Sequence, residues 1–409
     1  MQEDVTNSER IIFMIYVGID VASNKHDVCI MSEEGKIFGK IFQIQNSQDE
    51  YKKLLNKIKE AKKLFNDSIV RIGIESTGVY SSAIVNYFSN CDAIEVIYIN
   101  PILTNMFQHS ELVHYAKTDK IDAEGICNFL QQKKKKLYTY TPPSYHIQEA
   151  KSLGRELNNI NKSLNRQINH LTSLLHVVFP EFFQLFPKIK GKVCLSLLET
   201  FPTPKDYLNK RASTIFNIGY KAAKGHFSQY QADTLLNLAK HSIGCYSTSD
   251  AIIIKQLTQL IKLLTEQKIE LIKRMTALVK EHCPILLSVP GIGGNIACTL
   301  YGEIGDISNF HNADALVAFS GVNPLVYESG KFKAKNTIIS KKGSAYLRNA
   351  LIQASRIIAR VDPTFRNYFD KKKAEGKCYN SCINHVAKKL VRVLHHLLKN
   401  NCDYKIVNN

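Results

Sequence analysis

The sequence lacks any apolar run that approaches the roughly 20 residues needed to cross a bilayer. It also lacks the basic start of a signal peptide, because residues 2–4 are Gln-Glu-Asp. Its ten cysteines show no repeated spacing, as expected of reduced core thiols. Cys378, Cys382 and His385 could share a helix face as half of a zinc site, but buried small residues are the commoner explanation. These absences exclude a membrane-spanning protein and a disulfide framework, and they predict a cytoplasmic protein.

Acidic side chains are also scarce. The 409 residues include 54 lysines and arginines but only 36 aspartates and glutamates, so the net charge at pH 7 is +18. Such an excess favours a polyanionic partner, with nucleic acid first and an acidic membrane surface as the alternative. The 44% hydrophobic and 22% charged residues are typical of a globular chain with two or three domains.

Four of the acids have informative positions. Asp20 and Glu75 end short apolar runs that indicate buried strands, which would bring both carboxylates to one edge of a sheet. Asp119 and Asp122 are three residues apart, so a helix starting near Thr118 would point both in one direction. Four such acids would repel one another unless a hard divalent cation lay among them. We therefore predict that they bind one or two Mg²⁺ ions, although each acid alone is more often a strand-end or cap residue.

The order of apolar patterns in the first third of the chain predicts an α/β domain. We expect strands at residues 15–20, 27–31, 36–43, 69–75 and 96–99, and helices at 48–65, at 80–88 and over the Asp119 pair. Three strands, a helix and an acid-tipped strand are the order of the RNase H-like fold. A proline pair at 142 and 143 prevents a helix from continuing, so this domain is placed at residues 14–142.

Two apolar seams with spacings of three and four predict long helices at residues 153–178 and 253–278. We expect a coiled-coil region at 143–283, interrupted by a helical insertion at about 182–250. The two helices could pair antiparallel within the chain or with another chain.

The last region, residues 284–400, is predicted to be mostly helical. Its segment 289–293 matches a helix-hairpin-helix turn, in which Gly291 and Gly293 would expose backbone N–H groups to a DNA phosphate. A glycine-rich turn that only joins two helices is the alternative.

A one-signed basic stretch follows, because residues 329–361 contain eight lysines and arginines and no acid. An ordinary surface mixes both signs, so nucleic-acid phosphates are the favoured partners and a solvated face is the alternative. The predicted nucleic-acid-binding side chains are Lys331, Lys333, Lys335, Lys341, Lys342 and Arg348.

Ser329 lies before Gly330 and beside the basic stretch, and it is the best candidate for a nucleophile. A base or a bound metal ion would have to activate its hydroxyl. Taken alone, a serine in this position is more often a turn residue. Ser344 and Ser320 are the second choices.

Together these motifs resemble the IS one-ten transposases, the DEDD recombinases of bacterial insertion sequences. The resemblance is carried by Gly18-Ile19-Asp20, Glu75-Ser76-Thr77-Gly78, Asn100-Pro101, the segment 117–123, Pro290-Gly291-Ile292-Gly293, the segment 321–324, Ser329-Gly330, Lys342-Gly343 and Leu347-Arg348. It covers most of the chain except the insertion. Many family members have a second serine where this chain has Glu328, so Ser329 is the one serine candidate there.

The resemblance implies a RuvC-like domain whose four acids hold Mg²⁺, with Mn²⁺ as a substitute, joined through a coiled coil to a transposase domain. It implies that Ser329 attacks DNA and forms a phosphoserine link, which stores the bond energy for rejoining. It also implies a noncoding bridge RNA that selects element-end and target DNA by base pairing. A dimer or tetramer on DNA, associated with the nucleoid, would follow.

Two other functions stay open from the residues alone. A metal-dependent nuclease or Holliday-junction resolvase would use water as the nucleophile and leave no covalent adduct. A nucleic-acid-binding protein of a decayed element would bind in a salt-dependent way without cleavage.

Overall fold

A computed structural model describes residues 14–65, 69–76, 78, 80–111, 119–133, 137, 139–323, 328–329, 332–333 and 343–406. The side chains at 102, 108–111, 119–120, 328–329 and 332–333 lie outside the description. The chain divides into two compact units, Met1–Pro142 and Pro143–Asn409.

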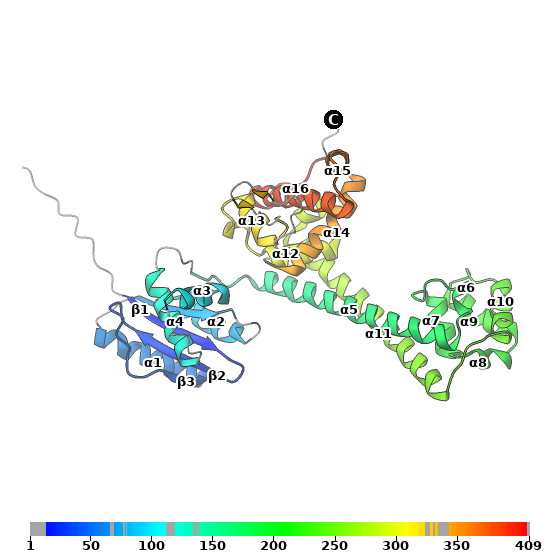
Figure 1. The fold of residues 1–409 in the computed structure, drawn as a ribbon, viewed down its shortest axis with the longest axis horizontal. Coiled ribbons are helices and arrows are strands. Elements are labelled where there is room, and N and C mark those ends of the chain that lie inside the picture. The colour runs from blue at the N-terminus through cyan, green and yellow to red at the C-terminus, as the bar shows by residue number, and fades with distance from the viewer. Residues whose placement is uncertain are drawn as a thin grey trace, which may run out of the picture. The chain divides into compact units, whose positions relative to one another are not determined.

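The first unit contains a five-stranded sheet with the order β3-β2-β1-β4-β5 (Figure 1). Its strands are β1 (Met14–Val21), β2 (Lys25–Met31), β3 (Phe42–Gln45), β4 (Ile69–Glu75) and β5 (Ile94–Ile99). Strand β2 runs antiparallel to β1 and β3, whereas β4 and β5 run parallel to the central β1. This is the topology of the RNase H-like fold, so the predicted fold class is confirmed.

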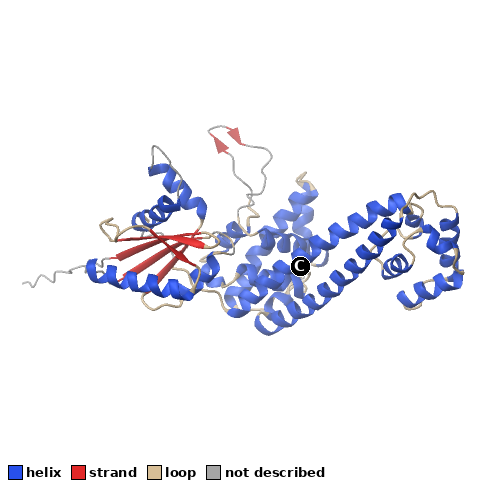
Figure 2. Ribbon diagram, turned by 90° about the horizontal axis from the view of Figure 1, so that it is seen from below, coloured by secondary structure: helices blue, strands red, loops and turns tan. Residues whose placement is uncertain are grey.

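Helices cover both faces of this sheet (Figure 2), which explains why the central residues of β1 and β4 are buried on both sides. On one face, α1 (Gln48–Phe65) and α2 (Ser81–Ser89) pack against alternate residues of β1, such as Val17 and Ile19. On the other face, α4 (Asp119–Gln132) packs against Tyr16 and the strands beside it. Because successive side chains of a strand point to opposite faces, the even-numbered residues of β1 face α4.

Two elements of this unit differ from the predictions. The strand expected at 36–43 is displaced to β3, because Gly35 and Gly39 adopt positive φ angles that interrupt extended backbone. Only an isolated bridge from Ile37 to Met31 precedes β3. Helix α3 (Pro101–Glu111) was not predicted, although a proline at a first helical position is a known start signal.

Buried His26 of β2 predicts a pH-dependent stability. It lies opposite Val21 and Ile44, its side chain is 0% exposed, and in the described part of the chain neither ring nitrogen has a hydrogen-bond partner. Burial lowers the pKa of His26 from its usual 6.5. Between the lowered pKa and 6.5 the unfolded chain binds more protons, so stability falls as the pH drops through this window.

We expect His26→Leu to reduce this acid sensitivity, measured as the difference between urea midpoints at pH 7.5 and about pH 5. His170→Leu, which removes an exposed histidine of the other unit, is the control and should keep the wild-type difference. Equal pH sensitivity in the wild type and His26→Leu would contradict the assignment.

The second unit is built on two long helices, α5 (Tyr145–Val178) and α11 (Thr248–His282), which lie side by side (Figure 1). The start of α5 shares a core with the end of α11, around Leu157 and Met275. The end of α5 shares another core with the start of α11, around Leu171 and Ile254. The two predicted seams therefore pair antiparallel within the chain.

The insertion between these helices is helical, as predicted. It consists of α6 (Phe182–Leu185), α7 (Lys192–Thr200), α8 (Pro204–Leu208), α9 (Ala212–Ala222) and α10 (Gln229–Lys240). Thr203, Ser228 and Ser247 form capping boxes that start α8, α10 and α11. Aromatic side chains, including Phe182 and Tyr207, fill its core.

In the C-terminal part, five helices pack around the start of α5 and the end of α11. They are α12 (Gly294–Ile304), α13 (Ala313–Ser320), α14 (Ala345–Val361), α15 (Pro363–Ala374) and α16 (Tyr379–Asn400), with the 3₁₀ turns η2 (Pro284–Ser288) and η3 (Ile307–Asn309). Strands β6 (Glu328–Ser329) and β7 (Phe332–Lys333) form a separate antiparallel pair. No helix in the described ranges is long and apolar enough to cross a membrane. The three-part division at 142 and 283 stays a prediction.

Candidate active site

Asp20 and Glu75 lie at the carboxyl ends of neighbouring parallel strands. The ladder between β1 and β4 pairs Ile19 with Ile74, so the next residue of each strand is one of these acids. Ile19 and Ile74 both face the α1/α2 core. Because side chains alternate along a strand, Asp20 and Glu75 belong to the opposite face, which α4 covers. Strand register thus brings two of the four predicted acids to one edge and one face.

Two glycines let α4 approach this face closely. A Cβ at Gly18 would lie 2.1 Å from the carbonyl oxygen of Ala123, and a Cβ at Gly73 would lie 2.7 Å from Ile126. Both glycines are two residues before a predicted acid, on the same face. The contact fixes the first turns of α4 beside the acidic edge, and Asp122 lies in those turns. Helix α4 begins at Asp119, whose side chain lies outside the description.

Hydrogen bonds fix the surroundings of this acidic edge. Thr104 of α3 donates a hydrogen bond to Glu75 Oε1. Asp27 of β2 stands directly opposite Asp20 in the ladder and is only 5% exposed. Its carboxylate accepts hydrogen bonds of 3.3 and 3.2 Å from the Gln43 amide. Asp27 is an acid that the sequence patterns did not single out, since nothing in its local spacing relates it to Asp20.

The acidic edge has the oxygen donors that Mg²⁺ prefers, but the described side chains do not form a ready ligand shell. Among them, no three His, Cys, Asp or Glu groups lie close enough together to hold an ion. Asp20, Glu75 and Asp122 therefore lie on one face of the sheet without forming an assembled metal site. The same finding applies to Cys378, Cys382 and His385, where the buried Cys382 thiol donates to the Lys377 carbonyl oxygen at 3.5 Å.

The three candidate serines have different surroundings. Ser320 is fully buried, and its hydroxyl donates to the Val317 carbonyl oxygen at 2.7 Å. Ser344 is the N-cap of α14, where its oxygen accepts from Leu347 N at 3.2 Å. The backbone of Ser329 lies in β6, in register with Phe332 of β7. The two alternative hydroxyls are thus engaged in structural contacts, whereas the Ser329 side chain lies outside the description.

A buried carboxylate anchors the end of the segment that carries Ser329. Glu303 of α12 is 4% exposed and accepts hydrogen bonds from Ser344 Oγ at 2.6 Å and from Arg155 Nε at 2.8 Å. The Arg155 guanidinium also lies 5.0 Å from the centre of the Tyr346 ring. Glu303 therefore ties α5 and α12 to the residue where the segment 324–342 joins α14. No sequence pattern pointed to Glu303, because its partners are 41 and 148 residues away.

Glu303→Gln should destabilise the second unit by about 1.5–3 kcal/mol, because a neutral amide cannot accept both hydrogen bonds with the strength of a carboxylate. The measurement is the free energy of unfolding in urea. Glu156→Gln, on the exposed face of α5, is the matched control and should stay within about 0.5 kcal/mol of the wild type. Equal stability of the two variants would show that the Glu303 contacts contribute no net stability.

The predicted helix-hairpin-helix turn joins two helical segments in the structure. Gly291 has a φ of +88°, and Ile292 N donates to the Val289 carbonyl oxygen at 3.1 Å to close the turn. Gly293 is the N-cap of α12 and makes no side-chain cap, so it leaves backbone N–H groups at an exposed helix start.

The predicted basic side chains are only partly described. Arg348 is half-buried, and one of its guanidinium nitrogens is buried without a partner among the described residues. The side chains of Lys331, Lys333, Lys335, Lys341 and Lys342 lie outside the described part of the chain. Their phosphate contacts stay predictions.

Comparisons with known proteins find relatives of this chain among transposases. Residues 17–180 match the DEDD family of IS110 transposases, and residues 283–370 match the transposase family of IS116, IS110 and IS902. A protein of insertion element IS110 from Streptomyces coelicolor is 26% identical over 156 residues, 38% of each chain. A protein of the IS117 mini-circle from the same organism is 23% identical over 94% of each chain. The chain thus spans 38% of the length of the IS110 protein and 94% of the length of the IS117 protein.

Among solved structures, RuvC of T. thermophilus in complex with a Holliday-junction substrate is similar to part of this chain. The match covers 31% of this chain and 99% of the RuvC chain. The sequence identity is 10% and the TM-score is 0.24.

The acid-edged RNase H-like unit and the helical C-terminal part thus overlap with matches to two transposase family models. The chain belongs to the IS110 family of insertion-sequence transposases.

Proposed function

We propose that this protein is a DNA recombinase that moves an insertion sequence. The observation that carries the proposal is the placement of Asp20 and Glu75 at adjacent strand ends, on the face that α4 covers with Asp122. Carboxylates gathered at one edge suit a divalent cation that contacts phosphodiester oxygens. The net charge of +18 supports a DNA partner.

Asp20, Glu75, Asp119 and Asp122 would hold Mg²⁺ or Mn²⁺. The bound ion would supply stabilisation of the negative charge that develops on the phosphate oxygens. The chain's own contribution to this site is orientation: strand register sets the first two acids, Thr104 holds Glu75, and the close contact at Gly18 sets the start of α4.

Ser329 would supply the nucleophile. Its hydroxyl oxygen attacks the phosphorus, the new Oγ–P bond replaces the bond to the leaving deoxyribose oxygen, and the serine proton leaves to a base while the leaving oxygen takes up a proton. One phosphoester bond replaces another, so rejoining needs no further energy source. The hydroxyls of Ser320 and Ser344 are engaged elsewhere, which supports Ser329.

A noncoding guide RNA transcribed from the element's flanks would select the donor and target DNA. The excess of basic residues suits recognition of the RNA backbone, while base pairing would choose the sequence. We propose a dimer or tetramer on DNA, in the cytoplasm and associated with the nucleoid.

Purified protein, Mg²⁺, this RNA and end-labelled element-junction DNA test the proposal. The expected product is a protein–DNA adduct that survives denaturation and requires both RNA and metal. DNA cleavage without an adduct would instead favour a metal-dependent nuclease or junction resolvase that uses water, the activity that the acidic edge alone would support.

A further inference from the structure

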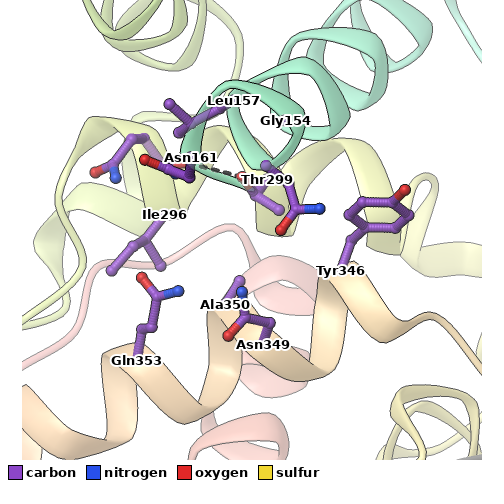
Figure 3. Close-up of a pocket in the computed structure, with 11 residues that line it drawn as sticks. Gly154, Leu157, Asn161, Ile296, Thr299, Tyr346, Asn349, Ala350 and Gln353 are labelled. Atoms are coloured by element: carbon purple, nitrogen blue, oxygen red, sulfur yellow. Dashed lines mark hydrogen bonds between the residues drawn. The ribbon is translucent and has the colours of Figure 1, made fainter. Parts of the chain in front are cut away.

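Helices α5, α12 and α14 meet around a polar hollow of about 60 Å³, which we name the amide groove (Figure 3). Leu157, Ile296 and Ala350 contribute apolar surface, and no acidic or basic side chain lines it. Its polar wall contains five amide side chains: Asn158, Asn161, Asn295, Asn349 and Gln353. The groove therefore combines an uncharged lining with an unusual concentration of one chemical group.

The amide groups of this wall are available to a ligand. In the part of the chain that the structure describes, none of the five amide side chains has a hydrogen-bond partner. Asn158, Asn161 and Asn295 are nevertheless half-buried, whereas Asn349 and Gln353 are exposed at the rim. Figure 3 shows Gln353 and Tyr346 rising from α14 toward the facing helices. Each amide offers two donors and one acceptor, so the wall can pair with a ligand that carries both kinds of group.

Nucleic-acid bases carry such mixed donors and acceptors, and Asn and Gln pair with their edges. Tyr346 adds an aromatic ring, with Arg155 beside it, of the kind on which bases stack. The hollow holds only a few water molecules, so a strand would lie across it rather than insert a whole base. A duplex is read by a convex element that enters its groove, whereas this surface is concave.

The groove lies between two features of the proposed DNA-processing part. Tyr346 is two residues after Ser344, the anchor of the segment that carries Ser329. Toward the other end of α14, Ile357 packs against the turn, since a Cβ at Gly291 would lie 2.9 Å from it. A strand in the groove would therefore run along α14 between these two features.

We propose that the amide groove binds one unpaired strand of nucleic acid, DNA or RNA, through the edges of its bases. The inference rests on the proposed function, because a recombinase that opens DNA or reads a guide RNA must hold unpaired strands. It adds a contact surface whose α14 residues lie within the basic stretch but carry no charge, and it shares no residue with the acidic edge.

The test measures binding of the full-length protein to labelled strands of about 16 nucleotides, the upper end of the site sizes of strand-binding folds, by fluorescence anisotropy at one salt concentration. Three probes are compared: unpaired DNA, unpaired RNA of the same sequence, and duplex DNA. The groove variant combines Asn349→Asp with Gln353→Glu, which places two negative charges at the exposed rim. The control variant combines Gln256→Glu with Gln259→Glu, exposed on α11 and outside the groove, and changes the net charge equally.

We expect the groove variant to bind an unpaired strand at least about tenfold more weakly than the control does, with less than about a threefold difference on duplex DNA. A stronger effect on RNA or on DNA identifies which strand the groove holds. A second groove variant, Asn349→Ala with Gln353→Ala, leaves the charge unchanged and should also weaken binding of unpaired strands selectively.

Equal binding of unpaired strands by the groove and control variants, with a wild type that binds all three probes, would overturn the groove assignment and leave the recombinase proposal standing. A wild type that binds none of the three probes would overturn both. The two failures are therefore distinguishable.

Discussion

Ser329→Ala should abolish the covalent protein–DNA adduct completely, because alanine has no oxygen with which to form the bond to phosphorus. The measurement is the fraction of end-labelled junction DNA that migrates with denatured protein in the presence of Mg²⁺ and guide RNA. Binding of the same DNA should change by less than about threefold, since a single hydroxyl contributes little to an interface dominated by phosphate contacts. The variant would thus lose the bond-forming step and keep DNA binding.

The two other serines provide matched controls. Ser320→Ala and Ser344→Ala should both keep the adduct. The Ser320 hydroxyl donates a hydrogen bond within the end of α13, and the Ser344 hydroxyl caps the start of α14. Ser344→Ala should cost about 2–4 kcal/mol of stability, because it removes both that cap and the hydrogen bond to the buried Glu303 carboxylate. An adduct that persists in Ser329→Ala and disappears in one of the others would move the nucleophile to that residue. Cleavage that is unchanged in all three would identify water as the nucleophile.

The sequence predicted much of the first unit because its signals are local. Apolar runs ending in Asp20 and Glu75 gave the two parallel strands, and helix α1 has the predicted bounds at both ends. The sheet register that makes these acids neighbours is not local, but it follows from the RNase H-like order once the strands are recognised. The two long seams likewise predicted α5 and α11, while only the structure shows that they pair with each other.

Other parts could not be predicted, for physical reasons that particular residues illustrate. Asp27 joins the acidic face through antiparallel pairing with Asp20, and Glu303 meets Arg155 across 148 residues, so no spacing rule relates these partners. The amide groove needs three helices that are far apart in sequence. Strand β3 was placed too early because its neighbouring apolar residues resembled a longer strand, whereas the glycines at 35 and 39 redirect the backbone.

Asp20→Asn should reduce metal-dependent strand cleavage and adduct formation by about a thousandfold, because it removes one charged oxygen donor of the proposed site while keeping its shape. The rates are compared over a Mg²⁺ titration in the presence of guide RNA and junction DNA. Asp92→Asn is the control: Asp92 is exposed and precedes β5, at the end of the parallel strands opposite to the acidic edge. It should leave the rates unchanged.

A readout that does not depend on activity separates a metal-binding role from a structural one. A cation that binds only the folded protein raises its melting temperature, so wild-type protein and Asp92→Asn should both gain stability on addition of Mg²⁺ and Asp20→Asn should gain less. Without Mg²⁺, Asp20→Asn should melt close to the wild type, because it also relieves the like-charge pairing of Asp20 with Asp27. A variant that melts much earlier without metal would indicate a structural carboxylate. Equal Mg²⁺-induced shifts of the melting temperature in all three proteins would show that the ion binds elsewhere. The carboxylates of the acidic edge would then not be metal ligands.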